Sequence, residues 1–175
     1  MRLTTTLSVA MSPLYRDPLD LSTPVDDLQY VFNRVLASGI ASARANRSWH
    51  DERTITGVDD IDLGGGSLFD AFGVAVVLKT VKAVLITNLS EEGTLIIGAA
   101  AAREWAEPFG AAGDTALVPP RSCRLFTCLV DGWPVDPGVA DRLRVNSGAD
   151  EVVYDILVVG THCTYSTTTT TTEAP

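Results

Sequence analysis

Residues 151–159 read Glu-Val-Val-Tyr-Asp-Ile-Leu-Val-Val, and they form the longest strand that the sequence predicts. After the first position, only Asp155 interrupts the apolar side chains. Valine, isoleucine and tyrosine favour extended backbone, and a strand that is apolar on both faces needs cover on both faces. We therefore expect residues 151–159 to lie at the centre of a two-layer sandwich or to pack against a neighbouring subunit.

Shorter strands precede this one along most of the chain. Each is either a short apolar run or an alternation of apolar and polar residues, and glycine, proline, asparagine or aspartate lies between one strand and the next. The pattern predicts roughly ten strands, spaced about 8–12 residues apart, which is typical of a β-sandwich or barrel. The predicted strands cover residues 3–9, 27–36, 47–63 (two strands with a turn at Gly57), 74–77, 81–87, 94–97, 115–118, 125–130, 141–145 and 151–159.

Three segments are also compatible with a helix or a loop. Residues 27–36 carry apolar side chains that fit a helical face as well as a strand face, and their β-branched and aromatic content favours the strand. Residues 67–72 predict one short helical turn capped by Ser67. The alanine-rich residues 99–105 predict a short helix or a loop. The expected fold is an all-β, antiparallel β-sandwich or jelly-roll-like domain with one or two short helical turns.

The two ends of the chain differ from its middle. Residues 1–24 combine a strand with three prolines, and proline neither donates a hydrogen bond nor favours helix before it. They predict an N-terminal strand and extended arm, followed by the β-sandwich domain at residues 25–163. Residues 164–175 form a threonine-rich C-terminal tail without periodicity, which we expect to be disordered.

The composition argues against several classes of protein. The chain has 175 residues and a formal net charge of −9, which suits one acidic domain and disfavours binding to nucleic-acid phosphates. Its three cysteines are an odd number without CxxC spacing, so we expect reduced thiols. No apolar run is long enough to span a bilayer, and residues 1–12 lack the apolar core of a secretory signal. The sequence predicts a soluble protein, not exported by a cleaved leader, that binds neither nucleic acid nor membrane.

Candidate catalytic residues are few. Either histidine, His50 or His162, could serve a Ser-His-Asp triad, but no GxSxG motif supplies the nucleophile. Ser67 follows three glycines without the required spacing and indicates a flexible turn. His162 and Cys163 are adjacent, and neighbouring residues of a strand point to opposite faces, so they are not expected to meet. We predict no catalytic residue and no enzymatic activity.

Candidate metal ligands also lack a recognisable pattern. Asp59, Asp60 and Asp62 resemble part of a calcium loop, but apolar residues alternate with them and no glutamate follows at the required position. The alternation indicates an amphipathic strand. Four potential zinc ligands have spacings that match no common site, and the cysteines among them predict small buried hydrophobes; the four are Cys123, Cys128, His162 and Cys163. The tryptophans are scattered and predict core or interface anchors; they are Trp49, Trp105 and Trp133. We predict no cofactor and no metal.

Seven blocks of the chain resemble a group of small virion proteins of tailed phages, found among head and tail structural genes. The blocks are LDLSTP (19–24), HDERT (50–54), DIDL (60–63), SLFDAFG (67–73), VKAVLITN (81–88), VNSG (145–148) and YDILVVGT (154–161). Their order is kept over residues 3–161. Each block is a strand or a turn, so the resemblance implies fold and context and implies no catalytic residue.

The resemblance implies a structural component of the phage particle, located in the virion and assembled in the host cytoplasm. Our first expectation is a capsid decoration or cement subunit that stabilises the head by binding the major capsid protein. Such proteins are often trimers or dimers, because symmetric sites favour closed oligomers, and the arm could reach a neighbour by strand addition. Two alternatives remain open: a tail or fibre-associated adhesin module, and a small hydrolase or carbohydrate-binding protein on a jelly-roll scaffold.

Overall fold

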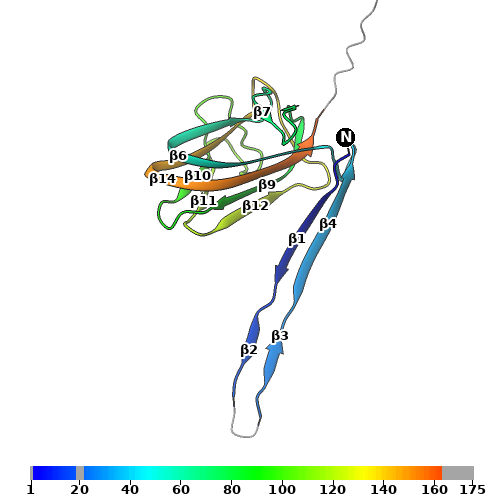
Figure 1. Cartoon of the computed structure of the whole chain (residues 1–175), viewed down its shortest axis with the longest axis vertical. Coiled ribbons are helices and arrows are strands. Elements are labelled where there is room, and N and C mark those ends of the chain that lie inside the picture. The colour runs from blue at the N-terminus through cyan, green and yellow to red at the C-terminus, as the bar shows by residue number, and fades with distance from the viewer. Residues whose placement is uncertain (1, 19–21, 163–175) are drawn as a thin grey trace, which may run out of the picture.

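The computed structural model describes residues 2–18 and 22–162, which form a β-rich body and a long projecting arm (Figure 1). The tail predicted at residues 164–175 lies outside the described residues. Fourteen strands and no helix occupy the described part of the chain, which confirms the all-β prediction. The strands are β1 (Thr5–Met11), β2 (Leu14–Arg16), β3 (Val25–Asp27), β4 (Tyr30–Ser38), β5 (Arg44–Ala45), β6 (Arg47–Asp62), β7 (Leu68–Phe69), β8 (Ala75–Val76), β9 (Thr80–Asn88), β10 (Leu95–Gly98), β11 (Thr115–Val118), β12 (Cys123–Thr127), β13 (Trp133–Pro134) and β14 (Arg142–Thr161).

The body is built on a seven-stranded antiparallel sheet organised around β14, with the small β7–β8 sheet beside it. On one side, β6 pairs with β14 over nearly its whole length, from Arg142 opposite Asp62 to Gly160 opposite Arg47. On the other side, β14 pairs first with β10 and then with β9. The strand order is therefore β11-β10-β14-β9-β12, with β6 also on β14 and β13 also on β9. Residues 151–159 are central within the sheet, because strands flank this segment on both sides. The expected cover on both faces is not found in the described residues, since Asp155 and Leu157 are exposed on the outer face.

The long strands β6 and β14 bend together. The sequence predicts turns at Gly57 and at residues 146–150, but the backbone remains strand through both positions. The two positions meet at a β-bulge between Asn146 and Glu151. There the Gly57 amide donates to Ser147 Oγ at 3.1 Å, and Gly57 has a φ of 91°, which glycine adopts without strain. These turn residues bend a continuous pair of strands around the core instead of ending them.

The bent sheet encloses the main core and almost closes on itself. The buried Asn88 of β9 donates its side-chain amide to the carbonyl oxygens of Gly93 and Val118, which ties β9 to the end of β11. Burial of apolar surface is the main stabilising term in such a body. The core side chains from the second half of β14 are Val152, Tyr154, Ile156 and Val158.

Strands β1 to β4 form a two-stranded arm that projects from the body (Figure 1). β1 pairs with β4 along its whole length, with Met11 opposite Tyr30 at the outer end, and β2 pairs with β3 beyond them. Most of residues 27–36 thus belong to a strand and not to a helix. The arm was expected to end at residue 24, but it continues to Ser38, because the chain reverses between β2 and β3 and returns as β3 and β4.

The expected helical turns are not found in residues 2–18 and 22–162. Residues 67–72 form the short strand β7 and a turn. The Asp70 carboxylate accepts hydrogen bonds from the amides of Phe72 and Val74, and so it stabilises a tight turn between β7 and β8. Residues 99–105 form a loop. Such short segments cannot sustain a helix on propensity alone, since nucleation is costly, and tertiary pairing decides their structure.

Candidate interaction surface

One face of the arm carries a continuous, mostly apolar stripe. In the register of β1 and β4, Leu7 lies opposite Arg34 and Val9 lies opposite Phe32. Facing residues of an antiparallel pair point to the same side. The Arg34 guanidinium lies 4.8 Å from the centroid of the Phe32 ring, which is a cation–π contact. We define the arm stripe as the side chains of this face, namely Leu3, Thr5, Leu7, Val9, Met11, Tyr30, Phe32, Arg34 and Leu36.

The opposite face of the arm is more polar. Ser8 lies opposite Asn33, and the Ser8 hydroxyl donates to Asn33 Oδ1 at 2.6 Å. Thr6 precedes this pair, and it lies opposite Val35. Scattered apolar side chains such as Val35 are ordinary on a protein surface. The arm is therefore amphipathic, although Val31 and Val35 are also exposed on this second face.

The base of the arm stripe is already packed on the body. Leu36 is buried in a small second core cluster with Val159 of β14, and Leu3 and Ala83 pack against this cluster. Beyond the base, the arm leaves the body (Figure 1), and Met11 is 65% exposed. An isolated two-stranded hairpin is only marginally stable in water. The outer arm thus lacks the packing that stabilises the body.

The tip of the arm exposes more apolar surface. Tyr15 of β2 is 69% exposed, and it lies opposite Asp26 of β3. Contiguous exposed apolar surface usually marks a binding site on a soluble protein. The exposed apolar side chains of β2, β3 and the residue after β3 are Leu14, Tyr15, Val25 and Leu28.

The outer side of the body sheet carries a second apolar surface. Leu157 of β14 lies opposite Leu85 of β9, which lies opposite Leu125 of β12. This row is adjacent to Val159 and Ala83, against which the base of the arm packs. Leu157, on the central strand β14, and Leu125, on the edge strand β12, are each 37% exposed. We define the sheet face by the outward side chains of these strands, namely His50, Glu52, Leu85, Thr87, Cys123, Leu125, Asp155 and Leu157.

Two carboxylates lie side by side on the sheet face. Asp155 of β14 is directly opposite Glu52 of β6, and both side chains are exposed. Like charges at opposed positions repel each other. Across the described residues, no basic side chain lies within ion-pair distance of either carboxylate. A shallow groove beside them is lined by His50, Leu85 and Leu157. The pair forms a negative site next to an apolar surface, open to a cation from outside.

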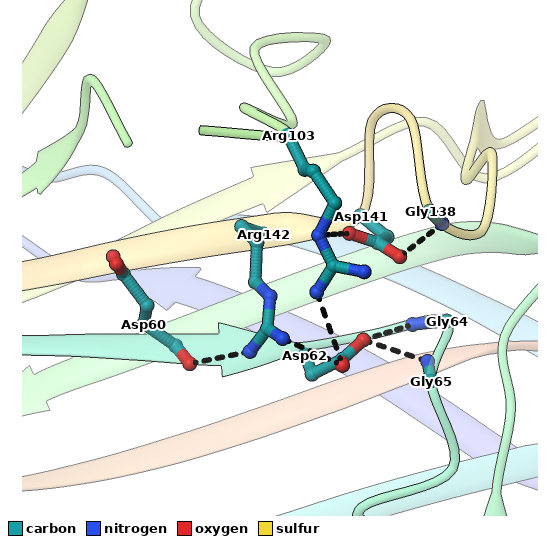
Figure 2. A network of polar contacts seen from close by, with 8 residues as sticks. All are labelled: Asp60, Asp62, Gly64, Gly65, Arg103, Gly138, Asp141 and Arg142. Carbon is teal, nitrogen blue, oxygen red and sulfur yellow. Dashed lines mark hydrogen bonds and ion pairs between the residues drawn. The ribbon is translucent and has the colours of Figure 1, made fainter. Parts of the chain in front are cut away.

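A polar cluster of a different kind lies where β6 ends and β14 begins (Figure 2). Asp62 Oδ2 is 3.0 Å from Arg142 and 3.4 Å from Arg103. Asp62 Oδ1 accepts hydrogen bonds from the amides of Gly64, at 3.2 Å, and Gly65, at 2.6 Å. A Cβ on Gly65 would lie 2.2 Å from Asp62 Oδ2, so a larger residue there would displace the Asp62 carboxylate.

The neighbouring Asp141 completes this cluster (Figure 2). Asp141 Oδ1 is 3.3 Å from Arg103 Nε, and Asp141 Oδ2 accepts a hydrogen bond from the amide of Gly138 at 2.6 Å. The Asp62 and Asp141 carboxylates are thus both bound by groups of the chain itself. The cluster thus fastens three loops to the end of β6 and the beginning of β14.

The other two candidate aspartates of β6 also have partners within the chain. Asp59 Oδ2 accepts hydrogen bonds from Arg53, at 2.6 Å, and from the Tyr154 hydroxyl, at 2.9 Å. Burial raises the pKa of the Tyr154 phenol, and the Asp59 carboxylate raises it further. Asp60 pairs with Arg144 at 2.7 Å, and this hydrogen bond lowers the pKa of Asp60. In the described chain, no group of three His, Cys, Asp or Glu side chains is placed to hold a metal ion.

The candidate catalytic residues do not form a triad in the described chain. His50 and Ser67 both line a shallow depression at the edge of β6, but no hydrogen bond joins the two side chains. His162 Nδ1 lies 2.6 Å from the carbonyl oxygen of Val77, and the His162 amide donates to Asn46 Oδ1, so this residue secures the end of β14. Cys163 lies outside the described residues.

Two cysteines are described, and both are free thiols. The predicted burial is wrong for Cys123, because β12 is an edge strand and the outer side of the sheet is uncovered there. Cys128 is half-buried.

The tryptophans confirm the prediction of core anchors. Trp49 and Trp105 are buried, and the rings of Trp105 and Trp133 meet edge to face at 6.2 Å between centroids. Trp105 Nε1 donates to the carbonyl oxygen of Pro134 at 2.7 Å, which satisfies its buried N–H group.

No protein-family model matches the chain, and no curated protein or solved structure shows significant similarity to it. The likeness to phage virion proteins therefore stays a prediction. No helix in the described residues is long and apolar enough to cross a membrane.

Sequence reasoning missed the Glu52–Asp155 pair. In the sequence, Asp155 stands out because it interrupts an apolar strand. The sequence does not show which strand lies opposite it.

Proposed function

We propose that this chain is a structural subunit of a tailed-phage particle, namely a capsid decoration or cement subunit that stabilises the head by binding the major capsid protein. The role is non-enzymatic and needs no cofactor. The resemblance of the sequence blocks supports the phage context. The observation that carries the proposal is the projecting arm, which exposes apolar side chains along its stripe and at its tip.

An extended arm is entropically costly to order. Ordering a strand costs backbone entropy of roughly 1–2 kcal/mol per residue, and a lone hairpin offsets this cost poorly. Exposed apolar residues such as Tyr15 and Met11 gain cover only when a second protein lies against them. An amphipathic arm on a well-packed body is therefore suited to holding neighbouring subunits together.

The body supports this role by holding the base of the arm in place. Leu36 is buried against Val159 of the central strand β14, so the arm emerges from the most extensively paired part of the sheet.

The test is binding of the purified chain to phage heads that lack it, measured by co-sedimentation. Because Met11 lies opposite Tyr30, a two-residue Asn-Gly turn can join them in place of residues 12–29 and preserve the rest of the arm. We expect this short-arm variant to keep the fold of the body and to lose head binding. Unchanged head binding would contradict the proposal. Electron microscopy that places the chain on the tail instead of the head would favour the tail-associated alternative.

A further inference from the structure

We propose that the sheet face of one copy is the docking site for the arm stripe of a second copy of this chain, with Arg34 of the arm bound between Glu52 and Asp155. This inference rests on the arm being an attachment element, as in the proposed function, and it names the first partner of the arm. The two copies thus bind each other through surfaces that one chain leaves open.

The first argument is that the two surfaces already fit each other at the base of the arm. Leu3 and Leu36 belong to the arm stripe, and they pack on the row of Val159 and Ala83. The next row of the sheet face continues this apolar surface at Leu157. The arm stripe and the sheet face therefore both continue outward from the contact at the base of the arm. Beyond that contact, each of the two surfaces is exposed within one chain.

The second argument is charge. Arg34 is the basic residue of the arm stripe, with Leu7 opposite it and Phe32 beside it. Glu52 and Asp155 are the carboxylates of the sheet face, and Leu157 and Leu85 lie in the adjacent row. A guanidinium placed between two carboxylates removes their mutual repulsion and forms charge-assisted hydrogen bonds. Each surface thus combines apolar side chains with one charged position, and the two charges are opposite in sign.

The third argument is reach. Figure 1 shows the arm pointing away from its own body, so the outer part of the arm stripe does not cover the sheet face of the same copy. From Thr5 to Arg16 the arm extends about 40 Å at about 3.4 Å per residue, whereas four strands of the sheet span about 15 Å. The inner arm is long enough to cross the sheet face of a second copy, and the tip reaches beyond it. That tip remains available for the head.

Two copies that exchange arms form the contact between arm stripe and sheet face twice. If each copy places its arm on the other, the same pair of surfaces is used twice in a closed dimer, and symmetric closure of this kind is the commonest form of association.

The test is a charge-reversal exchange, read as the mass of the particles in solution. The variant Arg34→Glu places a carboxylate against Glu52 and Asp155, and the double variant Glu52→Lys/Asp155→Lys places two cations against Arg34. All three side chains are exposed, so both variants are expected to fold, which thermal unfolding checks. We expect the wild-type chain to be oligomeric and each variant alone to associate more weakly, on the order of 30-fold or more.

Mixing the two variants is the decisive step. Each Lys-bearing body then receives the Glu-bearing arm of the other variant, and each wild-type carboxylate pair receives Arg34, so association returns. Arg16→Glu, with the same change of charge at the arm tip, is the matched control and should leave the mass unchanged. If Arg34→Glu fails to fold, Arg34→Gln removes only the positive charge and should also weaken association.

The outcomes separate this inference from the proposed function. A wild-type chain that stays monomeric, variants that associate like wild type, or a mixture that does not reassociate would each overturn the inference. Alkylation of Cys123 gives an independent readout, since this thiol lies on the sheet face and should react more slowly in the oligomer; equal reactivity would also count against it. Loss of head binding in the short-arm variant without any oligomer would leave the proposed function standing alone. An oligomer without head binding would leave only the inference.

Discussion

The arm and the body are built from the same antiparallel pairing, but their strands are covered differently. In the body, β14 has a neighbouring strand on each side and core side chains such as Tyr154 and Ile156 on its inner face. In the arm, β1 has one neighbour, β4, and only the base of their shared face is packed, around Leu36. The difference indicates that the body is stabilised by its own packing, whereas the outer arm has little packing within the described chain.

The largest expected effect contrasts one aromatic side chain from each region. Trp105 is 1% exposed and its indole N–H group is bonded, so Trp105→Ala should lower the free energy of unfolding of the body by about 3–5 kcal/mol. Phe32→Ala, in the arm stripe, should change it by less than about 1 kcal/mol, because this ring is outside the core. Urea unfolding followed by circular dichroism measures both. An equal loss of unfolding free energy in the two variants would mean that the arm and the body unfold together as one cooperative unit.

An intermediate effect is expected where the loops are fastened. Asp62→Asn weakens the contacts to Arg142 and Arg103, so it should lower the free energy of unfolding by about 2 kcal/mol. Asp51→Asn is the matched control, since the Asp51 side chain is 47% exposed and its pair with Arg53 should contribute less than about 1 kcal/mol. The same urea experiment measures both variants. A silent Asp62→Asn would show that the loops are held by their apolar contacts alone.

The sequence predicted the body better than the arm, for physical reasons that particular residues show. Residues 151–159 predict a central strand, because their apolar and β-branched side chains favour extended backbone locally. Gly57 was wrongly predicted to end a strand, since a glycine with positive φ can serve a turn or a bulge equally well. The pairing of Glu52 with Asp155 depends on register between strands far apart in the chain, and no local pattern encodes that register.

The smallest expected effect concerns the pairing of β6 with β14 in acid. The hydrogen bond from Arg144 lowers the pKa of Asp60 below its ordinary value of 3.8 in the folded chain. A carboxyl group of this kind contributes stability that is present above its unfolded pKa and is lost as the pH falls through its folded pKa. Asp60→Asn should therefore make the free energy of unfolding fall less steeply below about pH 4. Urea titrations at several acidic pH values measure how the free energy of unfolding changes with pH. The same dependence in Asp60→Asn and wild type would show that Asp60 does not contribute to stability in acid.

The most direct test of the difference between the two regions is hydrogen–deuterium exchange of the backbone amides, measured on the dilute chain and again after assembly on itself or on phage heads. The account predicts that amides of β1 to β4 exchange rapidly in the dilute chain and become protected in the assembly, while the core amides of β14 are slow in both. Arm amides that are already as protected as those of β14 in the dilute chain, or that gain no protection in the assembly, would contradict it.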